Sequence, residues 1–137
     1  MSPAAAARAV AWLRERGAAA HVVAGGLAGL LERWERLVRA VEDVYADDLD
    51  ELLNDLDTRE LLDGALVAAA EADMVVDARL AALDRRYRAA TEPCACLWGA
   101  DVAASEGWTP ASAWWYFRRP RVPGPALAAD LATRRDG

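Results

Sequence analysis

The chain has 137 residues and a net charge of −6; its 33 alanines and 16 arginines, with no lysine, isoleucine or glutamine, indicate the coding bias of a GC-rich genome. This length suits a single domain that buries a core without metal or disulfide staples, and the longest uncharged stretch, residues 17–31, is too short to span a bilayer. Because charged residues interrupt the N-terminal alanines, we expect no signal peptide and a cytoplasmic location.

The first predicted element is a helix that begins at Pro3, with Ser2 as its N-cap, and ends near Arg16. The segment that follows, residues 18–26, contains two adjacent glycines at its end. It can extend the first helix, but the two glycines must break or loosen that helix.

Two long amphipathic helices are expected next, over about residues 27–56 and 58–91. Apolar residues recur in both at steps of three and four, which is typical of a helix that presents a narrow seam to another helix. The first seam contains a stutter at Tyr45, where two consecutive steps of four shift its direction. The second seam contains one charged residue, Asp73. We expect Asp73 to fix register and oligomeric state by pairing with Arg39 or with an arginine of another subunit.

The turn between these helices is expected at residues 54–58, because Asp57 and Glu60 resemble a capping box. An uninterrupted helix is the alternative, since neither glycine nor proline breaks this segment. With the turn in place, the two helices form an elongated antiparallel hairpin on which the N-terminal helix packs. The sequence therefore predicts an all-α fold.

The composition changes at Pro93. Five of the six prolines and four of the six tryptophans lie at or beyond this residue. A short helix should include the aromatic run at residues 114–117, followed by an extended segment and a last helix over residues 126–135. We interpret residues 93–137 as a mostly irregular, aromatic-rich arm packed on a hairpin bundle of residues 1–92, within one domain.

Charge is distributed unevenly along the chain. Residues 42–77 hold thirteen carboxylates and one arginine, a net charge of −12, whereas residues 78–91 carry a net charge of +3. In the expected hairpin these stretches form an acidic tip and a basic base that includes Arg85 and Arg86. This polarity suggests head-to-tail association that salt would weaken.

The most unusual local feature is a run of four aromatic residues followed by arginines. Such side chains stack on bases and bind phosphates, and they also dominate the hot spots of protein interfaces. Alternatively, the rings are buried against the hairpin and the arginines cover its acidic surface. We favour burial or a protein interface. The run comprises Trp114, Trp115, Tyr116, Phe117, Arg118, Arg119 and Arg121.

No catalytic, cofactor or metal site is predicted. His21 is the only histidine, no serine has a convincing base, and the acidic run at residues 47–57 lacks the alternating ligands and central glycine of a calcium loop. Cys94 and Cys96 lie too close in sequence for a mutual disulfide and are expected to be reduced thiols. We therefore expect no enzymatic activity.

The predicted function is that of a non-catalytic assembly or adaptor protein, which is oligomeric and acts through protein–protein contacts. The expected interaction residues are the aromatic and arginine run together with Asp73, Arg85 and Arg86. The alternative is a nucleic-acid-directed protein. In that case the basic end and the arginine-rich arm bind phosphates, or the acidic stretch mimics DNA, as in an inhibitor encoded by a phage or mobile element.

Overall fold

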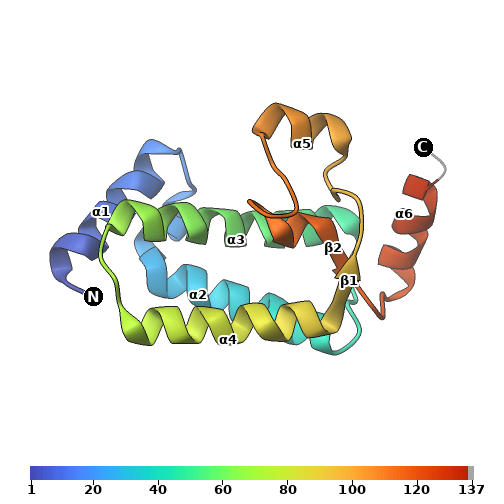
Figure 1. The fold of residues 1–137 in the computed structure, drawn as a ribbon, viewed down its shortest axis with the longest axis horizontal. Coiled ribbons are helices and arrows are strands. Elements are labelled where there is room, and N and C mark those ends of the chain that lie inside the picture. Colours follow the sequence, from blue (N-terminus) through green and yellow to red (C-terminus); the bar gives the residue numbers. More distant parts are fainter. Residues whose placement is uncertain (136–137) are drawn as a thin grey trace.

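The computed structural model describes residues 1–135, and the side chains through Thr133. The predicted all-α class is confirmed, with a small antiparallel pair of strands in which Thr91 lies opposite Pro120. Figure 1 shows the elements in chain order: α1 (Pro3–Glu15), α2 (Ala20–Glu42), α3 (Leu49–Ala69), α4 (Met74–Ala90), β1 (Thr91–Pro93), α5 (Ala100–Glu106), the 3-10 helix η1 (Trp114–Phe117), β2 (Arg118–Pro120) and α6 (Pro125–Arg135).

The predicted single helix over residues 27–56 is wrong, because two helices, α2 and α3, are joined there by residues 43–48. Asp48 caps the start of α3, and its side chain accepts a hydrogen bond from the Glu51 N–H at 2.9 Å. A carboxylate at this position satisfies a free helical N–H and interacts favourably with the helix dipole. The stutter at Tyr45 thus falls in a connection, and marks a change of chain direction instead of a shifted seam.

The predicted turn at residues 54–58 is also wrong, because these residues lie within α3. The alternative prediction, an uninterrupted helix through residues 54–58, is correct. The chain reverses instead at residues 70–73, where Ala70 adopts a left-handed conformation with φ of 53°. The hairpin over residues 27–56 and 58–91 is therefore replaced by three helices with two connections.

Asp73 was expected to lie in an apolar seam. It instead caps the start of α4. Its carboxylate accepts hydrogen bonds from the N–H groups of Val75 and Val76 and from the ammonium group of Met1. The expected pairing with Arg39 is wrong as well. Arg39 instead lies 3.7 Å from the carboxylate of Glu35, one turn earlier in α2.

The acidic stretch has no single tip in this arrangement. Residues 42–77 begin at the end of α2, cover the full length of α3 and end in the first turn of α4. Since the expected turn at residues 54–58 is absent, the carboxylates are spread along the molecule. The predicted separation into an acidic end and a basic end is therefore wrong.

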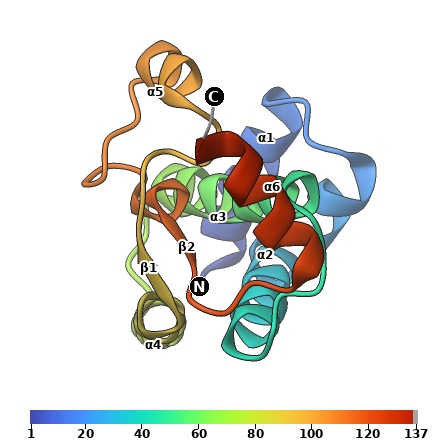
Figure 2. The ribbon, with the colours of Figure 1, turned by 90° about the vertical axis from the view of Figure 1, so that its right-hand side faces the viewer.

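Four helices form the body of the molecule. Helix α1 packs on α2 and α3, and α4 packs on α2. In the end-on view of Figure 2, α2, α3 and α4 occupy the corners of a triangle, and the two strands lie on its α3–α4 side. Helix α2 is kinked at Gly26, whose φ of 59° favours glycine, so the expected break at the paired glycines is confirmed. Residues 20–26 belong to α2 and do not extend the first helix, which ends at Glu15.

Most of the predicted seam positions are buried although the helix boundaries differ. Trp34 and Val38 of α2, Leu56 and Leu62 of α3, and Tyr87 of α4 are fully buried. The apolar periodicity reports which side of each helix faces the core, and this does not depend on where a helix ends. The same core takes in Trp115 and Tyr116 from η1.

Helix α6 is fastened to the connection between α2 and α3. The Gly124 N–H donates a hydrogen bond of 2.9 Å to the carbonyl of Tyr45, and Leu127 is fully buried. The Asp130 carboxylate accepts a hydrogen bond of 3.0 Å from the Leu49 N–H, which is one of the free donors at the start of α3. The last helix thus stabilises an element that lies about eighty residues earlier.

Replacing Gly124 with alanine should destabilise this junction. A methyl group there would lie 2.6 Å from the carbonyl oxygen of Tyr45, a backbone atom that cannot rotate away. Overpacking of this kind costs about 1–3 kcal/mol of unfolding free energy. In the control Gly29→Ala, the added methyl meets open space in α2, so stability should be unchanged or rise by up to about 1 kcal/mol. Equal urea midpoints for the two variants would contradict this account.

Candidate functional site

The centre of the molecule holds a buried guanidinium group. Arg59 of α3 is 4% exposed, and its Cζ lies 4.4 Å from the ring centre of Trp115, 5.7 Å from that of Trp34 and 5.9 Å from that of Trp114. Its charge is balanced by Asp84 of α4, with Nη2–Oδ2 and Nε–Oδ1 distances of 3.0 and 3.2 Å. The pair therefore joins α3 to α4 through a cage of indoles that comes from α2 and η1.

The aromatic run of η1 is largely part of this core. Trp115 and Tyr116 are buried, whereas Trp114 and Phe117 are half-buried. The Tyr116 hydroxyl donates a hydrogen bond of 2.6 Å to Asp57 of α3. Trp115 and Tyr116 are thus buried against the helices, as one interpretation of the run expects. An interaction surface on this run would consist of Trp114, Phe117 and the arginines that follow.

The two arginines of β2 and Arg121, which follows the strand, are held against neighbouring segments. Arg118 donates to the Thr91 hydroxyl at 2.9 Å and to two carbonyls near the end of α4, and Arg121 donates to the Ala89 carbonyl at 3.3 Å. Arg119 forms an ion pair of 2.9 Å with Glu92 of β1. Pairing of β1 with β2 thus brings Arg118 and Arg121 to the C-terminal end of α4 instead of over the acidic surface of α3.

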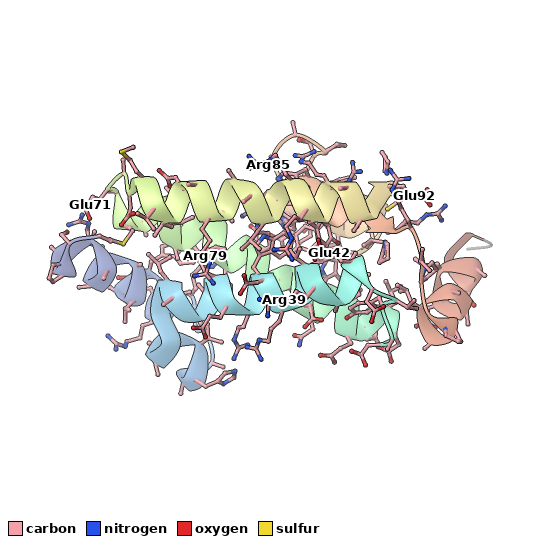
Figure 3. All side chains as sticks on the ribbon, turned by 90° about the horizontal axis from the view of Figure 1, so that it is seen from below. Arg39, Glu42, Glu71, Arg79, Arg85 and Glu92 are labelled. Atoms are coloured by element: carbon pink, nitrogen blue, oxygen red, sulfur yellow. The ribbon has the colours of Figure 1, made fainter. Side chains whose placement is uncertain are left out.

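Arg85 and Arg86, although adjacent, have different surroundings. Arg86 forms two hydrogen bonds, of 2.6 and 2.9 Å, with the Glu42 carboxylate of α2. In Figure 3, Arg79 and Glu42 lie between α2 and α4, whereas Arg85 lies on the side of α4 that faces away from α2. Within the described residues, Arg85 has no carboxylate within 4.0 Å. Of the two, Arg85 is therefore the one available to a partner.

We call the solvent-exposed side of α4 its outer face. Met74 is 88% exposed and Val75 is 79% exposed, which are high values for large apolar side chains. Small side chains continue this face at intervals of three and four residues until Arg85. This surface was not predicted from the sequence, although alanines recur on the side opposite the buried Leu83. The outer face consists of Met74, Val75, Ala78, Ala81, Arg85 and Ala89.

A groove of about 660 Å³ lies between α2 and α3. His21, Arg33 and Arg36 line one part of it, and Asn54 and Asp55 line another. Burial raises the pKa of Asp55 above its ordinary value, although a hydrogen bond from the Tyr45 hydroxyl partly opposes this shift. No side chain among the described residues hydrogen-bonds to His21, so nothing orients its imidazole as a general base. The groove offers polar binding groups and lacks an assembled catalytic pair.

Comparison with known proteins gives no relative: no protein family, curated protein or solved structure matches this chain. None of the helices within residues 1–135 is long and apolar enough to cross a membrane. In that part of the chain no three histidine, cysteine or carboxylate side chains are placed to hold a metal ion. Cys94 and Cys96 are free thiols, and burial raises the pKa of Cys94 to about 11.

Loss of the buried ion pair should be strongly destabilising. Asp84→Ala would leave the Arg59 guanidinium buried without its carboxylate, which costs about 3–5 kcal/mol of unfolding free energy. Asp63→Ala is the matched control. Asp63 lies 3.5 Å from the same guanidinium but is 53% exposed, so its loss should cost about 1 kcal/mol or less. Similar losses for both variants in urea unfolding would show that Asp84 is not the required partner.

Asp57 should make stability depend on pH. Burial raises the pKa of Asp57, and hydrogen bonds from Tyr116 and Trp98 only partly offset this. Ionisation is therefore harder in the folded state, and the stability present at low pH is lost as pH rises through the raised pKa. Asp57→Asn should gain stability relative to the wild type as pH rises above the ordinary aspartate pKa of about 4.

A control for this prediction is available at the surface between α2 and α4. The hydrogen bonds from Arg86 lower the pKa of Glu42, so Glu42→Gln should lose stability relative to the wild type as pH rises toward the ordinary value of 4.5, by a small amount because the pair is exposed. Urea unfolding at each pH measures both trends. Trends of the same sign for the two variants would contradict the assignment.

Proposed function

We propose that this chain is a non-catalytic assembly protein that associates with itself through the outer face of α4. The observation that carries the proposal is the exposure of Met74 and Val75 at one end of a face otherwise lined by alanines. Single exposed apolar residues are common on protein surfaces, whereas a continuous apolar strip indicates an interaction site. Alanines along the strip would let a second helix approach closely.

The charges at the edges of this face favour a second copy as the partner. Asp77 and Arg85 are both exposed and lie eight residues apart, about 12 Å along the helix. In an antiparallel pair centred on Ala81, Asp77 of each copy lies alongside Arg85 of the other. Such an arrangement is two-fold symmetric, so each favourable contact occurs twice.

A second candidate function is supported by the carboxylates around the connection between α2 and α3. Asp43, Asp47, Asp50 and Glu51 are exposed, and within the described residues none has an arginine within 4.0 Å. A dense group of unpaired carboxylates supports an acidic mimic of DNA. That function requires a DNA-binding protein whose complex with this chain is displaced by DNA. Competition with duplex DNA therefore distinguishes the mimic from the assembly protein.

The assembly proposal predicts that a charge at the centre of the outer face prevents association. Ala81→Glu should shift the mass measured by light scattering after gel filtration from a dimer to a monomer, because two carboxylates would meet at the two-fold axis. Ala7→Glu places the same charge at an exposed alanine of α1 and should leave the dimer intact. A wild-type chain that is monomeric at all concentrations would overturn the proposal.

A charge exchange tests the antiparallel geometry. Asp77→Arg and Arg85→Asp should each weaken the dimer, since each variant places like charges opposite one another. The double variant restores opposite charges and should recover the wild-type dissociation constant to within about threefold. A dimer that the double variant weakens further would show that these side chains do not meet.

A further inference from the structure

The C-terminal end of α4 gathers three guanidinium groups from two elements. Arg88 belongs to α4, and its Cζ lies 4.0 Å from the ring centre of Trp114. Arg118 and Arg121 belong to β2 and the residue after it, and both donate hydrogen bonds to carbonyls of the last turn of α4 or of Thr91. We call Arg88, Arg118 and Arg121 the arginine cluster.

The arginine cluster has no carboxylate to balance it. Within the described residues, none of its members has a carboxylate oxygen within 4.0 Å, because the nearby Glu92 is paired with Arg119. Burial, followed by repulsion from Arg88 and Arg121, lowers the pKa of Arg118 from its ordinary value. The three positive charges therefore lie close enough to oppose one another.

The helix end explains why arginines are placed here but does not neutralise them. The C-terminus of a helix carries about half a negative charge, so three guanidinium groups leave about two and a half positive charges uncompensated. The side chains of Arg118 and Arg121 already donate hydrogen bonds to the carbonyls of Arg88, Ala89 and Thr91. These contacts fix the orientation of the two side chains before any ligand arrives, which lowers the entropy cost of binding.

We propose that the arginine cluster binds a phosphate group, either free or as a phosphoester. A phosphate monoester carries about −1.5 to −2 charges at neutral pH, which matches the uncompensated charge better than a single carboxylate does. Guanidinium groups also donate paired hydrogen bonds to phosphate oxygens. A long nucleic acid fits less well, because the whole chain has a net charge of −6 and carries carboxylates along α3.

This site is distinct from the outer face of α4, and the inference does not rest on the proposed self-association. Arg88 is exposed and follows Arg85 by three residues, but it lies seven residues beyond the centre of the outer face at Ala81, and its Cζ lies 4.0 Å from the ring centre of Trp114. The monomeric Ala81→Glu variant should therefore bind phosphate as the wild type does. A failure of self-association and a failure of phosphate binding are separate results.

Calorimetric titration with pyrophosphate at low ionic strength tests the site. The wild type should bind with a dissociation constant below about 1 mM, and the Arg88→Ala/Arg121→Ala double variant should bind at least about tenfold more weakly. Arg118 is left in place because it also supports Thr91. The control is Arg79→Ala, which removes a positive charge from α4 nine residues before Arg88, where it is paired with Glu35 at 3.6 Å, so the affinity should stay within about twofold.

A titration of the wild type by NMR keeps the test independent of how the variants fold. Pyrophosphate should shift the backbone amides of residues 88–91 and 118–121 more than those of the groove between α2 and α3. Equal affinities for the wild type and the double variant, or shifts centred elsewhere, would overturn the proposal. Binding of a single-stranded oligonucleotide to the cluster without binding of pyrophosphate would also overturn it, in favour of a site for the nucleic-acid backbone.

Discussion

The structure depends on the positive charge of Arg59, which is buried in the core. An uncompensated buried charge costs several kcal/mol, so α4 must present Asp84 at one place. The indoles of Trp34 and Trp115 exclude water from the pair and offer their electron-rich faces to it. Residues from α2, α3, α4 and η1 therefore have to meet at one point, which turns the expected C-terminal arm into part of the core.

The apolar pattern of this chain identifies the buried faces but not the ends of the helices. Val38, Leu56 and Leu62 are buried as the periodicity predicts, because burial follows the side of the helix. The breaks at residues 43–48 and 70–73 contain no glycine or proline, so local conformational preference does not mark them. These breaks depend on aspartates that act as helix caps. The spacing of apolar residues in the sequence does not distinguish a carboxylate at a polar seam position from one at a cap, as Asp73 shows.

For the candidate sites too, the sequence identifies the unusual residues but not their surroundings in the fold. The unusual composition of residues 114–121 is evident from sequence, yet Trp115 and Tyr116 serve the core, since the aromatic residues that favour interfaces also favour interiors. The arginine cluster depends on strand pairing between segments almost thirty residues apart, and three-residue strands leave little periodicity to detect. The outer face of α4 was overlooked because alanines on an exposed helix do not by themselves distinguish a binding surface from an ordinary solvated one.

The contribution of η1 to the cage around Arg59 also bears on how the protein is made. During translation, Arg59 and Asp84 leave the ribosome before Trp114 and Trp115, at a rate of roughly 5–20 residues per second. For the few seconds before Trp114 and Trp115 emerge, the ion pair of Arg59 and Asp84 lacks these two rings, which help to shield it from water. The space that the two rings fill is then open. Native packing of this region is therefore completed late, and the nascent helices expose apolar surface on which holdase chaperones can act.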